Sequence, residues 1–146
     1  MRSPASWIRF VAPQLAAQLH PGAAVTPLAN PISSEMAVMR PSLWPGLIGA
    51  ARHNLNRQHE DLRLFEIGMV FADSAGSPAQ AEHLGGLCCG RAAPAHWSGK
   101  SREVDFFDLK QDVEWMLQNL FEEPVSFVAA EHPALHPGQS ARVLRE

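Results

Sequence analysis

The 146-residue sequence lacks most of the features that mark a secreted or membrane protein. Its two cysteines, Cys88 and Cys89, are adjacent. A disulfide between neighbours closes a strained ring, so we expect no disulfide framework. No apolar run approaches the roughly 20 residues that span a bilayer. The opening, MRSPASWIRF, also lacks the apolar centre of a signal peptide. We therefore expect no membrane association and a cytoplasmic location.

Charge of either sign is scarce. Charged residues make up 18% of the chain and the formal net charge is −3. No overall basic field draws such a chain to nucleic acid, so any RNA contact must be local or made by another domain or subunit. Apolar residues make up 46%. A chain of this length buries roughly 70% of the surface that its unfolded form exposes, so residues 1–146 are expected to form a single domain with its own core.

Motifs for metal binding and catalysis are also missing. Zinc ligands are usually paired two to four residues apart, and the cysteines form no C-x-x-C. The side chains of the types that bind metals are His83, Cys88, Cys89, His96, His132 and His136. The sequence has no G-x-S-x-G, no G-x-x-x-x-G-K-[ST] and no G-x-G-x-x-G. We expect no catalytic, cofactor-binding or metal-binding residue in this segment, and a buried cysteine pair in a strand.

Hydrophobic periodicity predicts an α+β fold. Strict alternation indicates strands, and steps of three and four residues indicate helices. Strands are expected at residues 6–11, 62–72, 83–90, 125–131 and 139–146, with an irregular edge at 23–31. Helices are expected at 12–20, 43–58 and 106–121. A loop of turn residues, 73–82, joins the two middle strands as in a hairpin, which favours an antiparallel or mixed sheet flanked by helices.

Arg40 and Glu66, in the central region, could be either catalytic or structural. Glu66 lies inside the most apolar strand, and a carboxylate there needs a partner. A salt bridge with Arg40, Arg52 or Arg63 is the interpretation that we prefer. The strand 62–72 has apolar residues on both faces, which indicates a central strand.

The two long helices supply the other structural or interface candidates. Ser42 is the expected N-cap of helix 43–58, and Pro45 fits its first turn, where backbone N–H groups lack partners. Asp105 and Asp108 are expected to cap helix 106–121. Leu117 belongs to the apolar stripe of that helix, which indicates core packing or a subunit interface.

Five motifs in this order resemble the core module of the bacterial phenylalanyl-tRNA synthetase beta subunit. They are N-P-I-S-x-E at 30–35, M-R-x-S-L-x-P-G-L at 39–47, L-F-E-I-G-x-V-F at 64–71, D-F-F-D-L-K at 105–110 and H-P-G-x-S-A at 136–141. Gln111, where the family usually has glycine, is a small departure. The resemblance implies a truncated fold like the catalytic domain of a class II aminoacyl-tRNA synthetase, with C-terminal strands missing, in a module that does not catalyse.

The same resemblance implies the partners. An alpha subunit would hold the sites for ATP, phenylalanine and the transfer reaction, and this segment would pack against it. ATP, magnesium and tRNA would be used by the whole enzyme, with no cofactor in this segment. Class II catalytic domains grip the ATP α-phosphate with an arginine in F-R-x-E, because arginine binds phosphate oxygens in a bidentate way. If Phe71 matches that phenylalanine, Ala72 replaces the arginine.

A segment of a larger subunit is expected to associate with itself when isolated. Apolar surface that missing neighbours would cover becomes exposed, and strand edges recruit other strands. We expect such surface around helix 43–58 and along the final strand, 139–146.

Two other functions stay open. A free-standing RNA-binding module would use a small basic and aromatic patch, although the net charge disfavours it. The residues of that patch are Arg52, Arg57, Arg63, Trp97, Lys100 and Arg102. A small hydrolase would use Cys88 or Cys89 as its nucleophile, although buried strand cysteines are usually inert.

Overall fold

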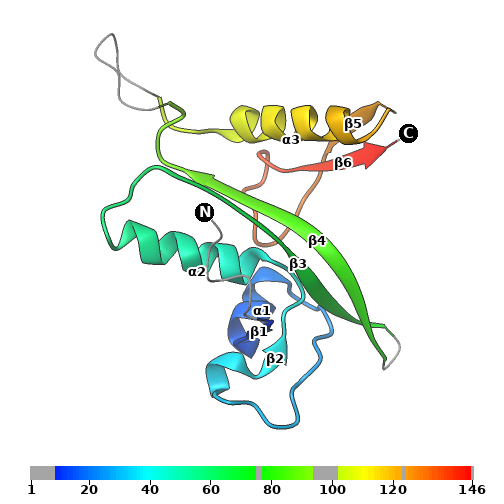
Figure 1. Ribbon diagram of the computed structural model, residues 1–146. Coiled ribbons are helices and arrows are strands. Elements are labelled where there is room, and N and C mark those ends of the chain that lie inside the picture. The colour runs from blue at the N-terminus through cyan, green and yellow to red at the C-terminus, as the bar shows by residue number, and fades with distance from the viewer. Residues whose placement is uncertain (1–8, 75–76, 94–101, 123, 146) are drawn as a thin grey trace. The chain divides into compact units, whose positions relative to one another are not determined.

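The computed structural model describes residues 9–74, 77–93, 102–122 and 124–145, and these form two compact units that divide between Leu87 and Cys88. The first unit contains β1 (Phe10–Val11), α1 (Pro13–Leu19), β2 (Val38–Met39), α2 (Trp44–Leu55), β3 (Leu62–Ser74) and most of β4 (Ser77–Cys89). The second contains α3 (Phe106–Leu120), β5 (Val125–Ala129) and β6 (Ala141–Arg145). Figure 1 shows these elements along the chain.

The structure confirms an α+β fold built on antiparallel pairs. The described strands form three two-stranded sheets: β1 with β2, β3 with β4, and β5 with β6. β1 pairs with β2 through Phe10 and Met39, and β5 pairs with β6 from Val125 opposite Arg145 to Ala129 opposite Ala141. β3 and β4 form the predicted long hairpin (Figure 1).

The prediction of a central strand at 62–72 is wrong for the part of the chain that the structure describes. There, β3 pairs with β4 alone. One face of β3 packs against α2 through Leu64 and Val70. On the other face Phe65 is 73% exposed and Ile67 is 56% exposed. The alternation therefore does not mark a uniformly buried face, because Phe71, farther along the same face, is only 4% exposed.

A small core closes the N-terminal end of the first unit. Val11, Ala16 and Val38 are buried together, with Val25 packed against them. α1 is shorter than expected at both ends and has its proline in the first turn. The segment expected to be irregular forms one isolated bridge, from Pro27 to Val38. Because proline cannot donate to a ladder, a single bridge at this edge is what the sequence allows.

α2 covers one face of the β3–β4 hairpin. Leu43 and Leu47 are buried with Val70, and Leu64 and Leu87 pack around them. A Cβ on Gly85 of β4 would lie 3.1 Å from Leu47 Cδ1 and 3.2 Å from Leu43 Cβ. The absence of a side chain at Gly85 therefore lets α2 pack close to the sheet. The sequence alone predicted only that this glycine weakens the strand.

The expected bounds of this helix need correction. Its N-cap is Leu43, and Ser42 Oγ instead accepts a hydrogen bond from Trp44 N at 3.3 Å. The helix ends at Leu55, three residues before the predicted end. Gln58 takes a left-handed φ of 65°, which turns the chain toward β3 and cannot continue a helix. No described helix is long and apolar enough to cross a membrane.

In the second unit, α3 packs on β5. Lys110 lies over the Phe127 ring, 5.1 Å from its centroid. On the apolar stripe of α3, Phe106, Val113, Met116 and Leu117 are half-buried, whereas Leu109 and Leu120 are exposed, and no residue of the helix is fully buried. Of the two roles expected for this stripe, packing in a closed core does not fit the exposed Leu109 and Leu120, and the role of a subunit interface stays a prediction.

The predicted loop at 73–82 is wrong where the structure describes it, because β3 continues to Ser74 and β4 already begins at Ser77, six residues before its predicted start. β5 ends at Ala129 and β6 begins at Ala141, each two residues from the predicted bound.

Candidate functional site

Arg40 and Glu66 form a buried ion pair, and they are the charged residues that the described chain buries. Arg40 is 1% exposed and Glu66 is 7% exposed. Arg40 Nη1 donates to Glu66 Oε1 at 2.6 Å, and Arg40 Nε donates to the Met69 carbonyl at 2.9 Å. Of the three arginines that the sequence offered as partners for Glu66, the structure selects Arg40. The preferred salt-bridge interpretation is confirmed.

Two glycines make room for this pair. A Cβ on Gly68 of β3 would overlap Arg40 Nη2. A Cβ on Gly46, in the first turn of α2, would lie 3.2 Å from Glu66 Oε2. The carboxylate therefore lies beside the N-terminal end of α2, whose dipole favours a negative charge. The two glycines therefore lie against the two charged groups of the pair.

The backbone around Arg40 joins the parts of the first unit. Arg40 N donates to the Arg9 carbonyl, and Arg40 O accepts from Phe71 N, each at 3.0 Å. Main-chain bonds thus connect the N-terminal strand pair to β3, while the side chain connects to Glu66. Pro45 is buried in the first turn of α2, as expected. The bonds of Arg40 therefore connect three segments of the first unit: the N-terminal strand pair, β3 and the loop that leads into α2.

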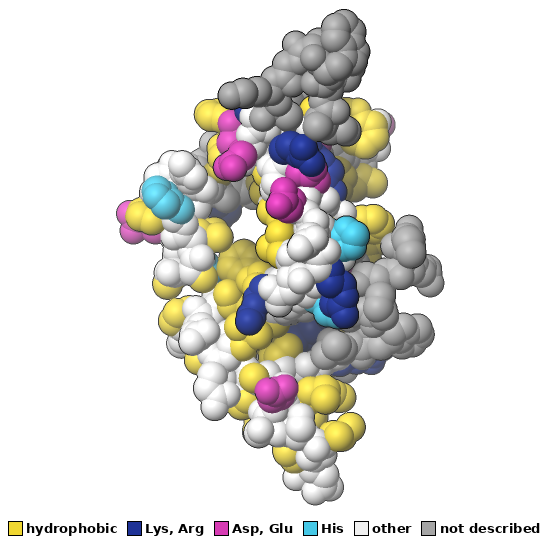
Figure 2. All heavy atoms as spheres, turned by 90° about the vertical axis from the view of Figure 1, so that its left-hand side faces the viewer, with side chains coloured by type: hydrophobic (Ala, Val, Ile, Leu, Met, Phe, Trp, Pro, Cys, Tyr) yellow, Lys and Arg dark blue, Asp and Glu magenta, His cyan; other side chains and the backbone are white. Residues whose placement is uncertain are grey.

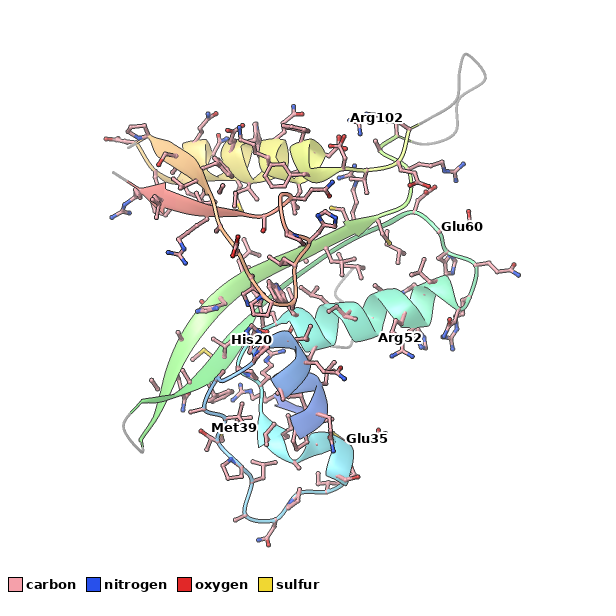
Figure 3. All side chains as sticks on the ribbon, turned by 180° about the vertical axis from the view of Figure 1, so that it is seen from behind. His20, Glu35, Met39, Arg52, Glu60 and Arg102 are labelled. Atoms are coloured by element: carbon pink, nitrogen blue, oxygen red, sulfur yellow. The ribbon has the colours of Figure 1, made fainter. Side chains whose placement is uncertain are left out.

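A second cluster at the start of α2 was missed in the sequence. His20 Nε2 lies 2.7 Å from Ser42 Oγ, and the His20 ring stacks on Trp44 at 5.3 Å between centroids. Figure 3 labels His20 beside this end of the helix. Ser42 and Trp44 are near in sequence, but His20 is 22 residues from Ser42, so only the folded chain unites them.

The capping prediction for α3 is confirmed. Asp105 is the N-cap and accepts from Phe107 N and Asp108 N, while Asp108 accepts from Asp105 N at 2.9 Å. Arg102 donates to both oxygens of Asp108, at 2.5 and 2.6 Å. These hydrogen bonds raise the pKa of the Arg102 guanidinium above its ordinary value, because they stabilise its charged form. The carboxylates are therefore occupied by the helix end and by arginine.

Leu117 is half-buried on α3, in the second unit. The six candidate residues divide between the units, with Arg40, Pro45 and Glu66 in the first and Asp105, Asp108 and Leu117 in the second. The structure brings Arg40, Glu66 and the first turn that contains Pro45 together, and it joins Asp105 with Asp108.

The cysteines lie at the end of β4 as free thiols. Both are half-buried, so the expectation of a fully buried pair is wrong. Neighbouring residues of a strand point to opposite faces, so the two thiols cannot act as one dithiol site. Within the described ranges no group of three histidine, cysteine or acidic side chains could hold a metal ion. Of the proposed RNA-binding patch, Trp97 and Lys100 lie outside the described residues, as does His96.

Comparison with known proteins gives a consistent result. A family model described as the phenylalanyl tRNA synthetase beta chain CLM domain matches residues 7–146. The phenylalanine–tRNA ligase beta subunit of Thiobacillus denitrificans is 50% identical over 132 residues, which cover 90% of this chain and 16% of that protein. The same subunit of Pseudomonas fluorescens Pf-5 is 46% identical over 138 residues, covering 94% and 17%. That of Methylococcus capsulatus is 46% identical over 135 residues, covering 92% and 17%. The chain thus spans 16–17% of the length of these relatives.

Proposed function

We propose, since this chain belongs to the family of the phenylalanyl tRNA synthetase beta chain CLM domain, that it is a non-catalytic scaffold within a phenylalanine–tRNA ligase. In that role it takes part in the ATP-dependent attachment of phenylalanine to its tRNA without carrying the chemistry. The ligase would act in the cytoplasm.

One observation carries the non-catalytic role. Arg40 and Glu66 are the buried charged residues of the described chain that would suit an active site, and each neutralises the charge of the other. Catalytic groups must reach a reacting atom within hydrogen-bond distance. Here the guanidinium is closed in by Gly68 and the carboxylate by Gly46. A charged pair used in this way holds strands and helix together.

We further propose that the fold is that of a class II synthetase catalytic domain that has lost its phosphate-binding arginine. With Phe71 aligned to the phenylalanine of F-R-x-E, Ala72 stands where the arginine would be. A methyl group cannot stabilise the negative charge that grows on phosphorus during adenylate formation. ATP and magnesium would then be bound by the alpha subunit, with no cofactor in this segment.

Co-expression with an alpha subunit of the same family tests the scaffold role. We expect this chain to be retained by an affinity-tagged alpha subunit, and to show no ATP–pyrophosphate exchange with phenylalanine on its own. Restoring arginine at position 72 by Ala72→Arg should not create exchange, because one side chain does not rebuild a site. Exchange by the purified chain, or a folded chain that alpha does not retain, would refute the proposal.

A further inference from the structure

Three exposed basic side chains lie at the C-terminal end of α2: Arg52 and His53 in its last turn, and Arg57 two residues after its last residue, Leu55. Arg57 Nη1 contacts His53 Nε2 and lies 3.3 Å from the His53 carbonyl. The rest of the Arg57 guanidinium, and all of the Arg52 guanidinium, have no hydrogen-bond partner in the described chain. An arginine has five N–H donors, so most of the donors here face solvent.

Three other cationic side chains of the described residues are joined to acids. Arg40 pairs with Glu66, Arg102 with Asp108, and Lys110 with Glu114. By contrast, among the residues that the structure places, no carboxylate pairs with Arg52, His53 or Arg57, although Glu60 and Asp61 follow in the loop. Figure 2 shows arginine and histidine side chains gathered on the face where α2 ends, and Figure 3 labels Arg52 pointing away from the hairpin.

Helix capping explains only part of this arrangement. A basic side chain near a helix C-terminus stabilises the last carbonyls, and Arg57 does so at His53. Arg52 makes no such bond, and the effect of the helix dipole falls off within the last turn. Unneutralised positive charge therefore remains beyond what the helix end requires.

We propose that the surface formed by Arg52, His53 and Arg57 binds the phosphate backbone of an RNA. This rests on the proposed function, because an assembled phenylalanine–tRNA ligase must hold a tRNA. Guanidinium groups bind phosphate oxygens in a bidentate way, which suits donors that are exposed and free. The contact is local, since a chain of net charge −3 has no overall attraction for nucleic acid. Such contacts position an RNA without reading its sequence.

A binding titration with a phenylalanine-accepting tRNA transcript tests this surface. The chain is compared with the double variant Arg52→Gln, Arg57→Gln and with a control of equal charge, Arg142→Gln, Arg145→Gln, on exposed positions of β6. We expect the α2 variant to weaken binding roughly tenfold near physiological salt, and to reduce the slope of log K against log salt by about one for each lost contact. The control should change both quantities far less.

Circular dichroism on each variant shows whether folding is retained. Equal losses in the two double variants, or no detectable binding of the parent chain at low salt, would overturn the RNA surface. Retention by the alpha subunit is measured on the same variants. If the chain binds the alpha subunit but not RNA, this proposal is wrong and the scaffold role is unaffected. If the parent chain does not bind the alpha subunit, the scaffold role is wrong.

Discussion

Gly68 lies directly against the guanidinium of Arg40, so closely that a Cβ on the glycine would overlap Arg40 Nη2. Arg40 is 1% exposed and cannot move into solvent without breaking its bonds to Glu66 and Met69. The glycine in the middle of β3 is therefore a condition for the buried ion pair.

Gly68→Ala should destabilise the chain by about 1–3 kcal/mol, the usual cost of overpacking a tight interior. Gly49→Ala is the matched control, since a Cβ on Gly49 of α2 would meet nothing within 4 Å. Alanine inside a helix is favoured over glycine by roughly 0.5–1 kcal/mol, so this control should be stabilising. Urea denaturation measures both. Equal midpoints for the two variants would show that Gly68 has free space around it.

The buried pair itself should behave differently when one partner or both are replaced. Glu66→Ala leaves the Arg40 charge buried and uncompensated, which costs about 3–5 kcal/mol. Replacing both by apolar residues of similar size, Arg40→Met with Glu66→Leu, should recover most of that loss. A double-mutant cycle gives the coupling free energy.

The exposed pair Lys110–Glu114 is the control for this cycle, because its side chains are 33% and 38% exposed. Its coupling should be at most about 1 kcal/mol. If the double replacement at Arg40 and Glu66 were as damaging as Glu66→Ala alone, the pair would owe its effect to shape and not to charge.

Local patterns in the sequence predicted the elements that short-range chemistry determines. α3 begins at Phe106 as predicted, because Asp105 and Asp108 form a capping box within four residues. β3 begins at Leu62 as predicted, because alternation is a local property. The start of α2 was misplaced, since Ser42 bonds to His20, which is distant in sequence.

The candidate site was predicted only in outline. Because Glu66 is a carboxylate in an apolar strand, the sequence predicted that it needs a partner, but three arginines were possible. Only the folded chain brings Arg40 Nη1 to 2.6 Å from Glu66 Oε1. Likewise, Gly68 and Gly85 could not be recognised as packing positions, because the side chains that approach them come from other segments.

The N-cap of α3 gives a third prediction. Asp105→Ala removes the acceptor for Phe107 N and Asp108 N, and loss of such a cap costs about 1 kcal/mol. Gln118→Ala, on the exposed side of the same helix, should change stability by less than about 0.5 kcal/mol. Helicity at 222 nm during thermal melting compares the two. Identical melting curves would mean that other groups satisfy the first turn of α3.

Leu117→Asp should be more damaging than Gln118→Asp. Leu117 is half-buried on the apolar stripe of α3, and Gln118 is exposed. Because Leu117 is not fully buried, we expect about 1–3 kcal/mol, less than a carboxylate in a closed core would cost. The Gln118 variant adds the same charge to the same helix, so it isolates the effect of position. Equal free energies of unfolding would show that this stripe is not docked.

The last prediction concerns self-association of the isolated chain. Exposed apolar side chains lie on the hairpin, where Phe65 and Ile67 of β3 are 73% and 56% exposed and Leu84 of β4 is 49% exposed. The final strand also exposes Val143 and Leu144, as expected, whereas Leu43 and Leu47 at the start of the 43–58 region are buried. Exposed apolar patches favour association, and a two-fold dimer is the commonest closed form. We expect sedimentation to show a dimer at micromolar concentration, which Phe65→Lys shifts toward monomer, whereas Arg142→Gln leaves it unchanged. A parent chain that stays monomeric at these concentrations would show that this face needs no partner.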